Sequence, residues 1–175
     1  MNESGEIVGR FAPSPSGRMH LGNVYTAVMS WLSVRRRGGR WILRIEDLDP
    51  QRSKLEYARL IEDDLRWLGL DWDEGGLDDV GPNGPYTQSR RGDIYARYLD
   101  ELARAGYIYK CRCTRADVMA TQAPHQSDGR VIYAGTCRPP QMPCRDVDLA
   151  VPGAVRLWVP NADICFDDLI AGPQR

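Results

Sequence analysis

The chain has 175 residues, of which 42% are hydrophobic and 27% are charged, and its formal net charge is −1. This balance is typical of a folded globular domain with a real core and excludes a disordered chain. The small net charge excludes a global attraction to nucleic acid, so RNA contact would need a local patch such as Arg35, Arg36, Arg37 and Arg40. No apolar run approaches the roughly 20 residues that span a bilayer. We therefore expect a cytoplasmic monomer with no membrane partner.

The N-terminal residues predict two strands separated by a helix. Apolar residues over 7–11 indicate a strand, which two prolines end. Apolar positions at helical spacing over 24–37 indicate a helix, and Gly38 provides its stop. A second strand is expected over 41–45. The loop between the first strand and the helix is therefore a candidate ligand site.

The next residues predict two further helices separated by a loop. An apolar stripe over 54–68 indicates a helix with Ser53 as its N-cap. Residues 71–88 are rich in glycine and proline and predict mostly loop. Ser89 is expected to cap a helix that ends near Ala105. The order of strand, helix, strand, helix and helix predicts an α/β layer with a parallel sheet.

From residue 107 onward the pattern changes. Residues 107–152, called the insert below, are too irregular for a packed sheet layer and need something other than a core to hold them. Thr114 and Asp117 form a capping box for one short helix. Two strand-like runs over 154–159 and 163–170 follow.

The loop after the first strand carries the first candidate site, Arg10-Phe-Ala-Pro-Ser-Pro-Ser-Gly-Arg-Met-His-Leu-Gly-Asn23. In a parallel sheet, ligands bind beyond the carboxyl ends of strands, where backbone N–H groups at a helix N-terminus favour phosphate oxygens. Gly17 and Gly22 allow a ligand to approach the backbone closely. His20 and Asn23 can donate hydrogen bonds to a phosphate. The structural alternative is that His20 is an ordinary loop or helix-cap residue.

The end of the second strand carries a related string, Leu43-Arg-Ile-Glu-Asp-Leu-Asp49. We expect Glu46 at the same sheet edge as His20, where its carboxylate can hold an α-ammonium group. Arg10 can pair with a carboxylate through two hydrogen bonds. The structural alternative is that Arg44 and Glu46 form an ion pair that supports the strand end.

The insert contains a candidate metal site. Cys111-x-Cys113 is followed by Tyr133-Ala-Gly-Thr-Cys137, and zinc prefers four tetrahedral ligands and tolerates loops with little core. In a cytoplasmic chain, cysteines serve as metal ligands more readily than as disulfides. The structural alternative is that these cysteines are simply buried.

The two strings resemble the signatures of the class I glutamyl-tRNA synthetases. His20-Leu-Gly-Asn23 is similar to the HIGH motif of that family, and the Arg-Ile-Glu-Asp string is typical of its glutamate group. The resemblance covers nearly all of the chain. It implies a Rossmann-type parallel-sheet catalytic domain, with its first half over 1–106, the zinc-binding insert over 107–152 and strands that return toward the domain over 153–175.

The resemblance also implies roles for individual residues. ATP, which enters with Mg²⁺ as a substrate, would bind at Pro13, Ser14, Gly17, His20, Gly22 and Asn23. L-Glutamate would bind at Arg10, Ala12, Ser14 and Glu46. His20 and Asn23 would act in catalysis, which joins the glutamate carboxylate to the α-phosphate of ATP.

Within the family, the chain resembles the glutamyl-Q tRNA(Asp) type, which transfers glutamate to the queuosine base of tRNA(Asp). Three features favour this type, namely Ser16, Leu48 and the absence of a histidine two residues after Cys137. The type implies a structural Zn²⁺ on Cys111, Cys113, Tyr133 and Cys137. His125 and Cys144 are the alternative fourth ligands.

Two other interpretations follow from what the sequence lacks. No Lys-Met-Ser-Lys-Ser-like loop, which contacts ATP in the family, occurs in the sequence. We therefore expect a fragment. The alternatives to the glutamyl-Q type are the N-terminal part of a conventional glutamyl-tRNA synthetase and a zinc-stabilised module that binds nucleotide or tRNA without catalysis.

Overall fold

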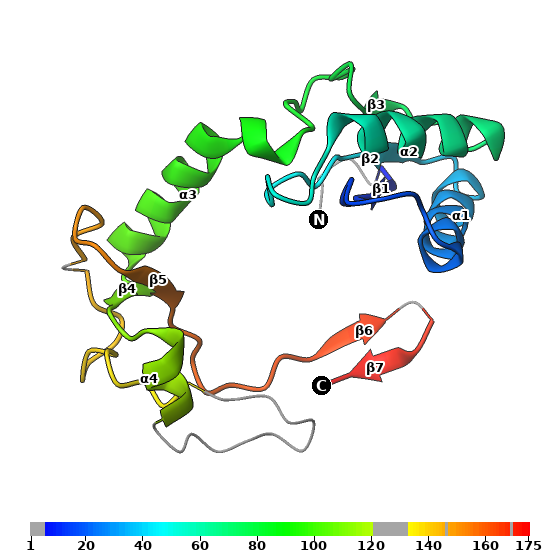
Figure 1. Ribbon diagram of the computed structural model, residues 1–175. Helices are drawn as coiled ribbons and strands as arrows, with labels where there is room; N and C mark the ends of the chain where they lie inside the picture. Colours follow the sequence, from blue (N-terminus) through cyan, green and yellow to red (C-terminus); the bar gives the residue numbers. More distant parts are fainter. Residues whose placement is uncertain (1–5, 121–132, 146, 169) are drawn as a thin grey trace. The chain divides into compact units, whose positions relative to one another are not determined.

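The computed structural model describes residues 6–120, 133–145, 147–168 and 170–175 (Figure 1). The chain divides into two compact units, Met1–Tyr95 and Ala96–Arg175. Helix α3 (Gly92–Ala105) passes from the first unit into the second. The boundaries that the sequence predicts at 106 and 152 remain predictions.

The first unit contains the predicted parallel sheet. Strands β1 (Val8–Phe11), β2 (Arg40–Leu43) and β3 (Glu74–Gly75) lie side by side in the order β1-β2-β3 (Figure 1). Both pairings are parallel, which confirms the α/β class. The third strand has two residues and lies within the stretch that the sequence predicts to be mostly loop.

Helices α1 (Leu21–Arg35) and α2 (Leu55–Trp67) supply apolar side chains to the same core as the sheet. Its buried members come from β1, β2, both helices and the segments beside them, and they are Phe11, Ala27, Val34, Trp41, Leu43, Ile45, Ala58, Ile61, Leu65 and Leu70. Gly9 permits α1 to approach β1 closely, because a Cβ atom there would lie 2.2 Å from Cγ2 of Val34. The core thus holds the carboxyl end of β1 in a fixed place beside α1.

The helix starts differ from those that the sequence predicts. Helix α1 begins at Leu21 rather than at 24, because the side chain of His20 caps it. Lys54, and not Ser53, is the N-cap of α2, and no side chain hydrogen-bonds there. Ser89 lies inside a short 3₁₀ helix, η1 (Gln88–Arg90), and its hydroxyl donates to Asp47 at 2.6 Å. The predicted caps at Ser53 and Ser89 are therefore wrong, the second because a tertiary contact takes the hydroxyl.

An ion-pair network connects the end of α1 to the segment after α2. The Trp31 indole N–H donates to Asp71, and the Arg35 guanidinium lies 3.2 Å from the same carboxylate. Burial raises the pKa of Asp71, but the hydrogen bond from Trp31 and the charge of Arg35 outweigh burial. The pKa of Asp71 therefore lies below its ordinary value. Ionised Asp71 therefore stabilises the fold above its unfolded pKa of about 3.9, and this contribution is lost as the pH falls through the folded pKa.

We expect Asp71→Asn to lower the free energy of unfolding at pH 7 by less than about 1 kcal/mol, since exposed ion pairs are weak. At pH 2 the difference between the variant and the wild type should be smaller, because the carboxyl becomes protonated as the pH falls through its folded pKa. Urea unfolding at the two pH values measures this difference. Asp78→Asn, at an exposed position, is the control and should leave both values unchanged. A difference of the same size at both pH values would contradict the prediction.

The second unit frames the insert with a two-stranded sheet. Strand β4 (Ile108–Cys111) pairs antiparallel with β5 (Ala154–Leu157), so the start of the insert is hydrogen-bonded to the strand that follows its end. Helix α4 (Arg115–Ala120) has the predicted capping box, in which the Asp117 N–H donates to the Thr114 hydroxyl at 3.2 Å. The predicted short helix is thus confirmed.

The last residues form a hairpin instead of the single predicted strand over 163–170. Strands β6 (Phe166–Asp168) and β7 (Gly172–Gln174) pair antiparallel. Ile170 and Ala171 donate backbone hydrogen bonds to the Asp168 carboxylate at 2.8 and 2.7 Å, which closes the turn. Among the described helices, none is long and apolar enough to cross a membrane.

Candidate active site and metal centre

His20 is fixed at the start of α1 by two hydrogen bonds. Its imidazole Nδ1 accepts from the backbone N–H of Gly22 at 3.1 Å, and its backbone N–H donates to Oδ1 of Asn23 at 3.2 Å. A neutral imidazole that accepts at Nδ1 carries its proton on Nε2. The structural alternative, a helix cap, is therefore present, but Nε2–H of the exposed imidazole has no hydrogen-bond partner among the described residues and can donate to a ligand.

A cavity of 560 Å³ lies beside this histidine, within the size range of small-molecule sites. It is lined by the loop after β1 and the first turns of α1. Of the residues that the sequence assigns to ligands, the structure brings together along this cavity Arg10, Ala12, Pro13, Ser14, Gly17, His20 and Asn23. Arg18 also lines it, which the sequence did not predict, and its guanidinium donates to Asp64 at 3.1 Å.

Glu46 and Gly22 are not among the residues that line the cavity. Glu46 follows β2, and its backbone N–H donates to the carbonyl of Pro13 at 3.0 Å, so the two predicted strings are hydrogen-bonded to each other. The Glu46 carboxylate accepts hydrogen bonds from Arg44 at 2.8 Å and from Gln88 at 2.9 Å. The ion pair that the structural alternative requires is thus present, and Gln88 is a second partner that the sequence did not predict.

The basic residues near the end of α1 are mostly engaged within the chain. Arg35 pairs with Asp73 at 2.7 Å, and Arg37 donates to the carbonyl of Ser33 at 2.8 Å. Arg40 pairs with Glu6 at 2.6 Å. These contacts neutralise or occupy three of the four arginines, which argues against a basic patch for RNA on this segment.

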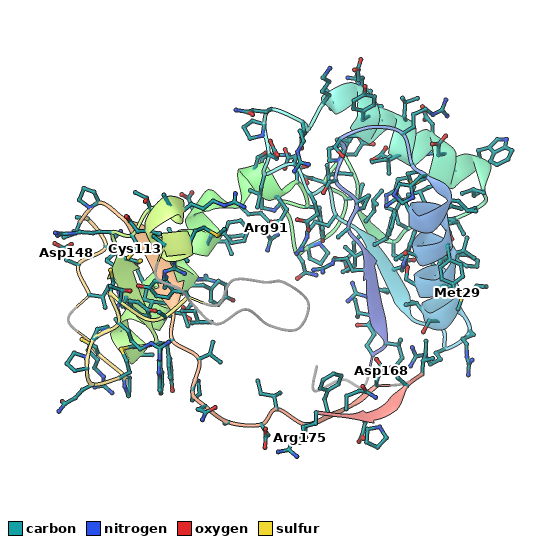
Figure 2. The ribbon with its side chains drawn as sticks, turned by 60° about the horizontal axis from the view of Figure 1, so that its bottom comes forward. Met29, Arg91, Cys113, Asp148, Asp168 and Arg175 are labelled. Carbon is teal, nitrogen blue, oxygen red and sulfur yellow. The ribbon has the colours of Figure 1, made fainter. Side chains whose placement is uncertain are left out.

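The metal ligands that the sequence predicts come together in the insert. The Sγ atoms of Cys111, Cys113 and Cys137 all lie within 4.8 Å of one another, and those of Cys113 and Cys137 are 3.5 Å apart. The Tyr133 hydroxyl oxygen lies 3.3 Å from Cys111 Sγ and 3.9 Å from Cys113 Sγ. Figure 2 labels Cys113 among the side chains of this unit.

These distances fit a tetrahedral zinc site. Zinc–sulfur bonds of about 2.3 Å in a regular tetrahedron place the sulfur atoms about 3.8 Å apart. The donor set of three thiols and one phenol is also of the right chemistry, since thiolates are preferred zinc ligands. Cys144 does not belong to the cluster among the described residues, and His125 lies outside those residues.

The pKa values of the four groups in this cluster shift in different directions. Burial raises the pKa of the Cys111 thiol, but its hydrogen bonds with Tyr133 and Arg156 outweigh burial and bring the pKa to about 6. The contact with Cys137 raises the pKa of Cys113, while the N–H of Arg112 lowers that of Cys137. Burial raises the pKa of Tyr133, so a phenolate ligand would need a metal ion to stabilise its charge.

Arg156 of β5 is a neighbour of the cluster that the sequence did not predict. Its guanidinium carbon lies 3.7 Å from the centroid of the Tyr133 ring. Its hydrogen bond to Cys111 is the largest of the causes that raise its pKa. A cation in this place offsets the negative charge that several thiolates bring together.

A known protein family matches a range of residues that includes both candidate sites. The family described as tRNA synthetases class I (E and Q), catalytic domain, matches residues 6–173. The chain belongs to this family. The resemblance that the two strings indicate, and the class I catalytic fold that it implies, are therefore confirmed.

Individual relatives of this synthetase family agree. The glutamyl-Q tRNA(Asp) synthetase of Symbiobacterium thermophilum is 51% identical over 175 residues, which cover 97% of this chain and 53% of the relative. The glutamate–tRNA ligase of the same organism is 44% identical over 169 residues, which cover 94% of this chain and 35% of the ligase.

The crystal structure of a glutamate tRNA ligase from Elizabethkingia meningosepticum, in complex with its amino acid, superposes with a TM-score of 0.76 at 32% identity. The superposed region covers 97% of this chain and 36% of the ligase. The chain spans about half the length of the glutamyl-Q relative that it matches.

Proposed function

We propose that this chain carries the part of a glutamate-activating enzyme that binds ATP and glutamate. ATP and L-glutamate react there to give glutamyl-adenylate and pyrophosphate, with Mg²⁺ on the phosphates. The glutamyl group is then transferred to the queuosine base of tRNA(Asp). The greater identity to the glutamyl-Q relative, 51% against 44% for the ligase, supports this acceptor over the 3′ end of a tRNA.

The observation that carries the proposal is the orientation of His20. Its Nδ1 is occupied by the cap of α1, so its Nε2–H is available beside a cavity that Arg10 and the loop after β1 also line. When the α-carboxylate of glutamate attacks the α-phosphorus of ATP, negative charge grows on the phosphate oxygens. A fixed N–H donor near those oxygens lowers the barrier because it stabilises the charge as it forms.

The other residues of the site orient the two substrates. The guanidinium of Arg10 is suited to a carboxylate of glutamate, and the carboxylate of Glu46 is suited to its α-ammonium group. Backbone N–H groups at the start of α1 add a favourable field for phosphate. Catalysis of this type depends mainly on positioning and charge stabilisation.

In the insert, Cys111, Cys113, Tyr133 and Cys137 would hold a structural zinc ion. The ion would hold together an insert whose described residues bury few hydrophobic side chains, namely Ile108, Tyr109 and Cys111, and it would leave no open position for a substrate. The hydrogen bond from the Cys137 N–H to the Tyr133 hydroxyl, at 2.8 Å, holds the phenol oxygen toward the sulfurs.

The acceptor is tested by glutamylation of three RNAs with radiolabelled glutamate. We expect transfer to tRNA(Asp) that contains queuosine, and none to tRNA(Asp) without queuosine or to tRNA(Glu). Transfer to tRNA(Glu) instead would identify a conventional glutamate–tRNA ligase. Binding of the RNAs without transfer, in the presence of ATP and glutamate, would favour a non-catalytic module.

A further inference from the structure

Gln88 lies 42 positions from Glu46 in the sequence but is held beside it in the first unit. It begins η1, and its side chain is buried, with 7% of the residue exposed. Its backbone N–H donates to the carbonyl of Ile45 at 2.9 Å, and the backbone N–H of Ile45 donates to the carbonyl of Tyr86 at 3.0 Å. These two bonds extend the sheet beyond β2 and fix the backbone of Gln88 next to that of Glu46.

The side-chain amide of Gln88 is turned toward the carboxylate of Glu46. Its Nε2 lies 3.0 Å from Oε1 and 2.9 Å from Oε2 of Glu46. Its own Oε1 is buried and accepts no hydrogen bond from any of the described residues. A buried acceptor without a partner is unfavourable, so another contact must determine this orientation of the amide. That contact is the carboxylate, because the flipped amide would place oxygen against oxygen.

The two oxygens of Glu46 are not held in the same way. Arg44 contacts Oε1 through two nitrogens, at 2.8 and 2.6 Å. Oε2 has Gln88 as its sole hydrogen-bond donor within the described part of the chain. Arg44 therefore anchors one oxygen, and Gln88 determines how the carboxylate plane is rotated about that anchor.

We infer that Gln88 is a positioning residue for glutamate, which fixes the rotation of the Glu46 carboxylate so that it meets the substrate's α-ammonium group. The inference rests on the proposed function, in which Glu46 binds that group. Gln88 acts through Glu46 and does not touch the reacting atoms. Its amide is suited to this place because it donates two hydrogens and carries no charge that would compete with the ammonium group.

The test is calorimetric titration of the whole chain with glutamate and, separately, with ATP and Mg²⁺. Gln88→Met keeps the length of the side chain and removes the donor, so the Kd for glutamate should rise about tenfold, as expected for hydrogen bonds to a charged group. The Kd for ATP should change less than about twofold. Gln88→Glu should weaken glutamate binding more than Gln88→Met, because it places a second carboxylate against Glu46.

Thr87→Val, in the neighbouring position, is the matched control and should leave both dissociation constants unchanged. The Tm of each variant, measured by thermal unfolding, is the check on whether the fold is retained. A double-mutant cycle with Glu46→Gln then separates positioning from general stability. If Gln88 acts through Glu46, Gln88→Met should raise the Kd by less than about twofold in the Glu46→Gln background.

The outcomes distinguish a failure of the Gln88 inference from a failure of the proposed function. A tenfold loss for Gln88→Met that disappears in the Glu46→Gln background supports the inference. Equal losses in both backgrounds, equal losses for glutamate and ATP, or no loss for Gln88→Met would overturn it, while the proposed function would stand. A wild-type chain that binds ATP but not glutamate would overturn the proposed function and this inference with it.

Discussion

His20→Asn is expected to lower the rate of glutamate-dependent pyrophosphate exchange by about 100-fold to 1,000-fold while leaving the fold intact. Asparagine is a good N-cap, so its side-chain oxygen can still accept from the Gly22 N–H. It is too short to replace the Nε2–H donor that the proposed function places beside the α-phosphate. Loss of one donor that stabilises charge in the transition state has an effect of this size. The measurement is the exchange rate at saturating ATP and glutamate.

His20→Ala serves as the matched variant because it removes both the cap and the donor. Its free energy of unfolding should fall by about 1 kcal/mol, while that of His20→Asn should stay within roughly 0.5 kcal/mol of the wild type. Both variants should lose exchange activity alike. If His20→Asn kept its activity and only His20→Ala lost it, His20 would be a helix cap and nothing more.

Cys137→Ser is expected to abolish zinc binding and to unfold the insert. The wild-type chain should contain roughly one zinc ion, held by the four ligands of a structural site. Structural zinc in small domains contributes on the order of 10 kcal/mol to folding, and the insert has little apolar core to replace it. Zinc content by mass spectrometry, together with the rate of proteolysis within 107–152, measures the effect.

The control for this variant is Cys165→Ser, because Cys165 is exposed and lies outside the cluster among the described residues. It should keep its zinc and its resistance to protease. Tyr133→Phe tests the fourth ligand and should weaken zinc binding, whereas Cys144→Ser should not. Stoichiometric, tightly bound zinc in Cys137→Ser would contradict the proposed ligand set, and a loss of zinc in Cys144→Ser would replace Tyr133 with Cys144.

The sequence predicts the parts of this molecule that depend on local patterns. The α/β class, the parallel pairing of the first two strands and the capping box of α4 all follow from short-range apolar spacing and turn residues. The close approach of the three cysteines also agrees with the motif. Their role as zinc ligands, and the ligand roles in the loop after β1, remain proposals.

What the sequence did not predict depends on contacts between distant residues. Gln88 reaches Glu46 because the segment just before η1 pairs with Ile45 beyond the end of β2, and nothing in the local pattern around Gln88 indicates that neighbour. Arg156 lies over Tyr133 because β5 pairs with β4 across the insert. The predicted start of α1 at residue 24 is late because histidine is an uncommon N-cap, so the sequence indicates a cap at His20 only as an alternative.

The most direct test of the account is glutamate-dependent exchange of radiolabelled pyrophosphate into ATP by this chain, without tRNA and with zinc present. The account predicts exchange that requires glutamate and that neither aspartate nor glutamine supports. A folded, zinc-loaded chain that shows no exchange at any glutamate concentration would contradict the claim that these 175 residues hold a working activation site.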